Sequence, residues 1–180
     1  FGRLLQKRTG AAFFDADRAA RLLVDEDVAV RRLLREEFGA EIFSARGDLN
    51  RAALRAIVFA ESEKKRALEQ ILHPRIRLQW AAEANLSRET GALFLADIPL
   101  LYETEGESLC DCVVVVACSQ TIQQRRLMAR ARLTQPEAFA MISAQMPLPQ
   151  KIARADHVVW NNGPLPVLEA QAECLARLWS

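Results

Sequence analysis

Two carboxylates follow the first apolar run of the sequence and could act on a substrate hydroxyl. The string DADRAAR, residues 15–21, comes directly after the run Ala11 to Phe14. In open α/β sheets, ligands bind at the carboxyl ends of strands. Asp15 and Asp17 could there accept a proton from a hydroxyl group or hold a metal through water. The alternative is that Asp17 only caps the helix that follows.

A third acid, Asp97, stands near the end of a second apolar run and is followed by Pro99, Leu100 and Glu103. An acid in this position can serve as the metal-side carboxylate of a phosphoryl-transfer site. A polar strand end followed by a proline turn is the competing interpretation.

Arginines are concentrated between Gln123 and Arg132. Arg126 and Arg130 are four residues apart, so a helix places both on one face. Two guanidinium groups so arranged can bind phosphate oxygens and stabilise charge during transfer. A solvated surface helix explains the same pattern without any such role.

Two further pairs are ambiguous. Asn161, Asn162 and Gly163 follow the last apolar run, where Asn-Gly indicates a turn and the amides could also contact an adenine edge. His73 precedes Pro74, and we expect His73 to cap a helix that Pro74 begins. A lone histidine is more often structural than catalytic.

Four short apolar runs stand out, and the third, with four consecutive valines, shows no alternation. Such runs predict strands covered on both faces, as in a parallel sheet flanked by helices. They are Ala11 to Phe14, Ala92 to Ile98, Cys112 to Ala117 and His157 to Trp160. Helical patterns separate the runs, which is typical of βαβ units. Helix signals include Phe1 to Arg8, a stop at Gly39, an N-cap at Asn50, a capping box from Thr134 to Glu137, and the stripe Leu165, Leu168, Ala172, Leu175.

About 65 residues lie between the first two runs, far more than a crossover needs. We therefore expect an inserted helical subdomain. A second long segment, Ser119 to Asp156, separates the third and fourth runs and is rich in arginine. One helical insertion and one arginine-bearing flap suit a small-molecule kinase that closes over its substrates.

Composition excludes several classes of function. The 180 residues are 51% hydrophobic and carry a net charge of +1, which gives no electrostatic case for binding nucleic acid or a membrane surface. No apolar run approaches the roughly 20 residues needed to span a bilayer. Four cysteines favour a reducing, cytoplasmic setting. Cys110 and Cys112 could be half a metal site, but we interpret them as buried small hydrophobic residues.

In order and spacing, these motifs resemble the dephospho-CoA kinase family along nearly the whole chain. The matching strings are FFDADRAAR, LNRAALRAIVF, LEQILHPRI, DIPLLYE, VVVVA, QQRRLMARARLT and AQMPLPQKIARADHVVWNNG. The resemblance implies an α/β, three-layer P-loop NTPase-type parallel sheet flanked by helices. It also implies ATP-dependent phosphorylation of the ribose 3′-hydroxyl of dephospho-CoA, the last step of coenzyme A synthesis, with ATP and Mg²⁺ as cofactors.

The resemblance further assigns roles within a single kinase domain. Asp17 is the expected base, and Arg126, with Arg130 beside it, meets the ATP phosphates. Residues 161–163 form the loop beside adenine, and Asp97 is the expected magnesium-side carboxylate. The expected CoA contacts are Asp15, His73, Pro74 and Leu100. The parts are a core of residues 1–24, 92–118 and 157–180, a helical CoA-binding insertion 25–91, and a lid 119–156.

Three departures from the family pattern stand out. The P-loop motif G-x-x-x-x-G-K-[ST] does not occur in this chain, which starts about where that loop should end. Either the chain is truncated or preceding residues are missing from it, and we expect a polypeptide of only these residues to be poorly stable and nearly inactive. Trp160 replaces a usual acid, and Ala131-Arg132 replaces a common Asp-Gly in the lid.

Two alternatives remain at this point. A nucleoside monophosphate kinase would share the sheet and lid but accept another substrate, and the His73-Pro74 insertion with the DADRAAR string argues against it. A non-catalytic module that binds CoA or a nucleotide would explain the missing P-loop. Such a module needs no proton acceptor, so Asp17, Arg126 and Arg130 together favour the kinase. The oligomeric state is open.

Overall fold

The computed structural model describes residues 1–131 and 133–179. The chain divides into two compact units, which are described separately below. One unit runs from Phe13 to Ile98, and the other joins Phe1–Ala12 to Pro99–Ser180. Arg132, one of the lid residues that depart from the family pattern, lies outside the described residues.

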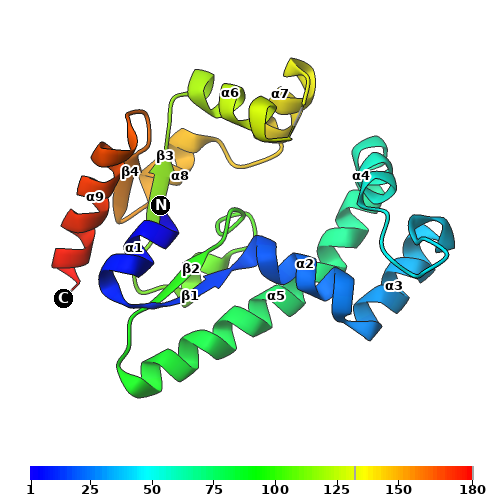
Figure 1. Ribbon diagram of the computed structural model, residues 1–180, viewed down its shortest axis with the longest axis horizontal. Coiled ribbons are helices and arrows are strands. Elements are labelled where there is room, and N and C mark those ends of the chain that lie inside the picture. Colours follow the sequence, from blue (N-terminus) through cyan, green and yellow to red (C-terminus); the bar gives the residue numbers. More distant parts are fainter. Residues whose placement is uncertain (132, 180) are drawn as a thin grey trace. The chain divides into compact units, whose positions relative to one another are not determined.

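The first unit holds a pair of strands and the helices between them (Figure 1). Strands β1 (Ala12–Asp15) and β2 (Phe94–Asp97) are neighbours in a two-stranded sheet. The predictions of a strand within residues 11–14 and another within 92–98 are therefore confirmed to within a residue or two. The intervening helices are α2 (Ala16–Glu26), α3 (Val28–Phe38), η1 (Ala40–Ile42), α4 (Arg51–Ala60) and α5 (Ser62–Thr90).

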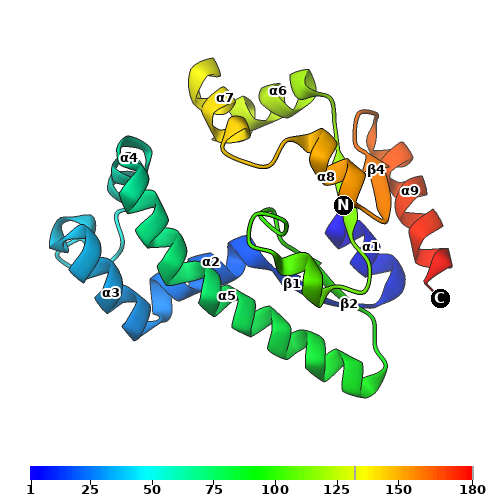
Figure 2. The same cartoon turned by 180° about the vertical axis from the view of Figure 1, so that it is seen from behind.

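An apolar cluster joins these helices. Val30, Leu34 and Ile42 are completely buried in it. The apolar face of α5 packs against this cluster, and helices α2, α3 and α4 all contact α5, as can be followed from behind in Figure 2. Val30, Leu34 and Phe38 are buried at helical spacing, so one face of α3 contributes to this core.

Side-chain caps set the starts of three helices in this unit. The carboxylate of Asp27 accepts a hydrogen bond from Val30 N, and Asn50 accepts one from Ala53 N, as predicted for Asn50. For α2, however, the cap is Asp15, whose carboxylate accepts from Arg18 N at 2.9 Å. The alternative that Asp17 is the cap is therefore wrong, because Asp17 already lies inside the first helical turn.

Pro74 does not begin a helix, contrary to the prediction. It lies inside α5, which continues through it from Ser62 to Thr90, so His73 is also a residue of the helix interior and not a cap. Residues on both sides of the proline, Leu68 and Ile76 among them, pack against the same apolar cluster. The Arg75 guanidinium also donates to the carbonyl of Ile71, at 2.7 Å, in the adjoining turn. Packing on a common core thus outweighs the local cost of an interior proline.

The second unit contains the other strand pair. Strands β3 (Val114–Ala117) and β4 (His157–Trp160) are parallel, in register from Val114 opposite His157 to Ala117 opposite Trp160. Both strands were predicted. Its helices are α1 (Gly2–Thr9), η2 (Gly106–Leu109), α6 (Gln120–Ala131), α7 (Gln135–Ser143), α8 (Leu148–Arg154) and α9 (Leu165–Leu178).

Helices α1 and α9 lie side by side in this unit (Figure 1). The predicted stripe of α9 is buried at Leu168, Ala172 and Leu175, whereas Leu165 is exposed. The predicted capping box is present at the start of α7. Hydrogen bonds from the hydroxyl and the main-chain N–H of Thr134 hold the pKa of Glu137 below its ordinary value.

The structure tests the interpretation of Cys110 and Cys112 as buried hydrophobic residues. Cys110 is half-buried beside the cluster of Tyr102, Val113 and Val115, but Cys112 is exposed, so its interpretation as a buried residue is wrong. Cys112 lies just before β3, which begins at Val114. Among the residues that the structure describes, no helix combines the length and the apolar character required to cross a membrane.

Candidate active site

The expected base and its neighbour occupy different places at the start of α2. Asp15 is the last residue of β1, and one of its carboxylate oxygens caps α2 by accepting a hydrogen bond from Arg18 N. Asp17 lies in the first turn of α2 and is exposed. The positive end of the helix dipole favours a carboxylate there. Because Asp15 caps α2, the Asp17 carboxylate is not used as the helix cap.

Asp97 is the last residue of β2, the strand that pairs with β1. Two neighbouring strands therefore both end in an aspartate, Asp15 in β1 and Asp97 in β2. Among the described residues, no three His, Cys, Asp or Glu side chains are grouped closely enough to hold a metal ion by themselves. A divalent ion at Asp97 would need ligands from water or from a bound substrate. Mg²⁺ accepts that arrangement, since it commonly binds one or two carboxylates together with substrate phosphates.

Two of the expected CoA contacts, His73 and Pro74, lie in the middle of α5, His73 half-buried and Pro74 exposed. Leu100 belongs to the other unit, where it is half-buried in the turn that begins at Pro99.

The structure does bring the candidate nucleotide residues of the second unit together. Arg126 and Arg130 are exposed on α6, and the Nη1 of Arg126 donates to the main-chain carbonyl of Asn161 at 2.8 Å. The side-chain oxygen of Asn162 accepts from Ser119 N at 2.8 Å, just before α6 begins. The loop after β4 is thus joined to α6 at two points.

The loop itself continues the strand ladder. Asn161 N donates to the carbonyl of Ala117 at 2.7 Å, which extends the pairing of β3 with β4 by one residue. At Gly163 a Cβ atom would meet Val167 only at ordinary contact distance, 3.6 Å, and the backbone is not left-handed. Neither the backbone conformation nor the space at this position therefore demands a glycine.

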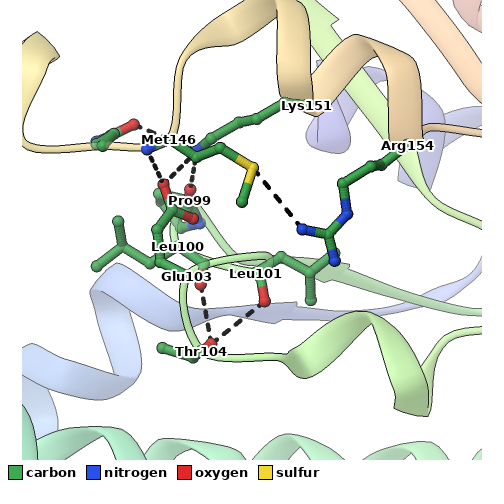
Figure 3. A network of polar contacts seen from close by, with 9 residues as sticks. Pro99, Leu100, Leu101, Glu103, Thr104, Met146, Lys151 and Arg154 are labelled. Atoms are coloured by element: carbon green, nitrogen blue, oxygen red, sulfur yellow. Dashed lines mark hydrogen bonds and ion pairs between the residues drawn. The ribbon is translucent and has the colours of Figure 1, made fainter.

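Sequence reasoning missed a polar network in the same unit, which Figure 3 shows. Glu103 and Lys151 form an ion pair at 2.8 Å, and Glu103 also accepts from Met146 N at 2.8 Å. Burial raises the pKa of Glu103, but the bonds from Lys151 and Met146 outweigh it and hold that pKa below its ordinary value. Glu103 was noticed only as an acid after a strand, because nothing local in the sequence connects it to residues more than 40 positions away.

Comparison with known proteins gives one consistent result. A family model described as dephospho-CoA kinase matches residues 2–166. The chain is 42% identical over 176 residues to a dephospho-CoA kinase from Anaeromyxobacter dehalogenans, covering 97% of this chain and 83% of the relative. It is 38% identical to one from Geobacillus kaustophilus, covering 97% and 88%.

Two solved structures agree. A Thermus thermophilus protein of known structure superposes with a TM-score of 0.72 at 34% identity, covering 97% of this chain and 88% of that one. Dephospho-CoA kinase from Campylobacter jejuni superposes with the same TM-score of 0.72, covering 99% and 91%. Its identity is only 21%, so this likeness bears on the fold alone. The predicted α/β fold of the P-loop kinase type is thereby confirmed.

Proposed function

The chain belongs to the dephospho-CoA kinase family, and from that premise we propose that it transfers the γ-phosphoryl group of ATP to the ribose 3′-hydroxyl of dephospho-CoA. The product is coenzyme A, and the reaction is the last step of its synthesis. The observation that carries the proposal is the family match along residues 2–166, which includes all the motifs that carry the candidate residues.

Asp17 is the proposed general base. During transfer a new P–O bond forms at the 3′ oxygen, the bond between the γ-phosphorus and its bridging oxygen breaks, and ADP leaves. The hydroxyl proton passes to the Asp17 carboxylate. The exposed position of Asp17 in the first turn of α2, where a substrate hydroxyl can reach it, supports this role.

Arg126 and Arg130 are the proposed phosphate ligands. Arginine offers five N–H donors, so the single bond from Arg126 to the Asn161 carbonyl leaves other donors for phosphate oxygens. Residues 161–163 are proposed to contact adenine. Because the Arg126 guanidinium is bonded to that loop, adenine binding and phosphate binding would involve one connected group of residues.

Asp97 is the proposed magnesium-side carboxylate, and Asp15 ends the neighbouring strand. When bound, Mg²⁺ neutralises phosphate charge. These two residues suit an ion whose remaining ligands are water and phosphate oxygens, as the carboxylate count of the described residues requires.

The remaining assignments concern the acceptor substrate and the organisation of the chain. We propose CoA contacts from Asp15, His73, Pro74 and Leu100. Residues 25–91 form the proposed CoA-binding insertion, 119–156 the lid, and 1–24, 92–118 and 157–180 the core. Helices make up nearly all of residues 16–90, which supports the first of these parts. The few cysteines support a cytoplasmic location.

A substrate panel tests the proposal. The full-length gene product is supplied with ATP and Mg²⁺ and then with dephospho-CoA, AMP, CMP or pantetheine phosphate, and ADP release is followed. Turnover on dephospho-CoA at least about a hundredfold above the others in kcat/KM is expected, a ratio that contacts to one substrate can provide. A preference for a nucleoside monophosphate, or binding of dephospho-CoA without ADP release, would instead support one of the alternative functions.

A further inference from the structure

Glu103 is the centre of a polar network that joins two segments of the second unit. Its Oε1 accepts from the main-chain N–H of Met146 and from the Nζ of Lys151, both at 2.8 Å. Lys151 also donates to the carbonyl of Pro99 at 3.1 Å (Figure 3). The turn that follows β2 is therefore held at two points, Pro99 and Glu103, by Met146 just before α8 and by Lys151 within α8.

The turn between these two points is itself well ordered. The hydroxyl and the main-chain N–H of Thr104 both donate to the carbonyl of Leu100, at 2.8 and 3.1 Å. Gly106 N donates to the carbonyl of Leu101 at 2.8 Å. Residues 99–106 thus behave as one block, and a group that holds Glu103 and Pro99 also determines where Leu100 lies.

The ion pair of Glu103 with Lys151 is largely shielded from solvent, so it can restrain the turn. The side chains of Lys151 and Glu103 are 13% and 20% exposed, whereas Arg177 and Glu173, an ion pair on α9, are 78% and 40% exposed. Exposed pairs contribute little, but a shielded carboxylate with two donors on one oxygen is a strong local restraint.

A second restraint acts at the other end of α8. The guanidinium of Arg154 lies 4.5 Å from the ring centre of Tyr102, and it forms an ion pair with Glu107. Tyr102 is in the same turn as Leu100, so α8 contacts the turn through both of its ends. This leaves the turn little freedom as long as α8 is in place.

The nucleotide residues have a separate attachment. Arg126 is bonded to the Asn161 carbonyl and Asn162 to Ser119 N, and neither bond involves the turn or α8. A change at Glu103 should therefore move the turn that carries Leu100 and leave the Arg126 side in place.

We propose that Glu103 and Lys151 are positioning residues for the acceptor substrate, which hold the turn of residues 99–106, and Leu100 in it, in the position that binds dephospho-CoA. The inference rests on the proposed function. It assigns no contact with the reacting atoms to either side chain.

Three variants separate this role from a general one. In Glu103→Gln the amide oxygen can still accept from Met146 N and from Lys151, so we expect a change of about threefold or less in the KM for dephospho-CoA. In Glu103→Ala both bonds are lost, and this KM should rise about tenfold while the KM for ATP stays within about twofold. In the exchanged pair, Glu103→Lys with Lys151→Glu, the KM for dephospho-CoA should stay as high as in Glu103→Ala. A lysine at position 103 has no acceptor atom for the hydrogen bond from Met146 N. Arg177→Met removes an exposed ion pair and serves as the matched control, with both KM values unchanged.

A second readout does not depend on turnover. Hydrogen exchange at the Met146 amide should be protected in the wild-type protein and in Glu103→Gln, and should accelerate at least about tenfold in Glu103→Ala. Assays are run well below each variant's unfolding midpoint.

The inference is overturned if Glu103→Ala leaves the KM for dephospho-CoA or the Met146 exchange rate unchanged, if both KM values rise equally, or if the exchanged pair restores activity. Failure of the proposed function would give a different result. The wild-type enzyme would then release no ADP with dephospho-CoA, and the positioning role would be rejected together with the function.

Discussion

The guanidinium of Arg126 donates to the main-chain carbonyl of Asn161, 2.8 Å away, and so connects α6 to the loop that follows β4. An exposed arginine on a helix usually samples many rotamers, at a cost in entropy when it binds a ligand. The hydrogen bond to the Asn161 carbonyl already restricts the Arg126 side chain before any ligand binds. Because the acceptor belongs to the main chain, the connection does not depend on the side chain at position 161.

Replacing Arg126 should lower kcat strongly. We expect Arg126→Met and Arg126→Lys both to lose about a hundred- to a thousandfold in kcat, since a lysine cannot bond a carbonyl and fork onto a phosphate at once. Arg125→Met, on the same helix and also exposed, is the control and should stay near wild type. Steady-state kinetics with saturating dephospho-CoA gives the answer. Full activity of Arg126→Lys would show that only positive charge is needed there.

Asp17 and Asp15 should respond oppositely to substitution. Asp17→Asn removes the proposed base but no cap, so kcat should fall about a hundred- to ten-thousandfold with little change in thermal stability. Asp15→Ala removes the cap of α2 and should cost about 1 kcal/mol of stability, whereas Asp15→Asn should keep it. Unfolding curves and kcat are measured on the same samples. Near-normal turnover of Asp17→Asn would rule out the assigned base.

Much of the fold was readable from the sequence because its signals are local. Each strand lies in a mainly apolar run, Asn50 caps one helix and Gly39 ends another, and Val30, Leu34 and Phe38 repeat at helical spacing. Predictions from local sequence signals were wrong where contacts with distant residues determine the structure. At Pro74 the continuous core keeps α5 intact through a residue that would otherwise end it.

The site was predictable in part for the same reason. The family motifs contain Asp17, Arg126 and residues 161–163, whose roles remain proposals. The cap of α2 is Asp15 and not Asp17, the alternative considered from the sequence, and only the backbone conformation decides between the two. The bond of Arg126 to Asn161 and the pair of Glu103 with Lys151 join residues 35 or more positions apart. No periodicity or spacing encodes such contacts, since they follow from how the chain folds back on itself.

Glu103 should make stability depend on pH on the acid side. Its pKa in the folded protein lies below the ordinary value of 4.5, so the folded state holds this proton less tightly than the unfolded state does. Its contribution is then complete above the ordinary pKa and is lost as the pH falls through the lowered folded value. The charged group that contacts Glu103 is Lys151, and Met146 N also donates to its carboxylate. Arg154, Glu107 and Asp156 lie around Tyr102, which is in the same turn.

The measurement is urea unfolding between about pH 3 and pH 6, on the wild type and on Glu103→Gln. The free energy of unfolding of the wild type should fall more steeply toward low pH than that of the variant. Parallel curves would mean that Glu103 carries no lowered pKa in solution.

The helical cluster of the first unit should depend on Leu34. This side chain is completely buried between α3 and its neighbours, so Leu34→Ala should lower the free energy of unfolding by about 2–5 kcal/mol. Leu22 on α2 is 42% exposed, and Leu22→Ala should cost less than about 1 kcal/mol. Denaturant unfolding compares the two. Equal losses would place the core of this unit elsewhere.

The position of the new phosphate in the product tests the central claim most directly. The full-length enzyme is incubated with ATP, Mg²⁺ and dephospho-CoA, and the product is examined by phosphorus NMR and by mass. The account predicts a single added phosphomonoester on the ribose 3′ oxygen, with one ADP formed for each product molecule. A phosphate at another position, or ADP formed without any phosphorylated dephospho-CoA, would contradict it.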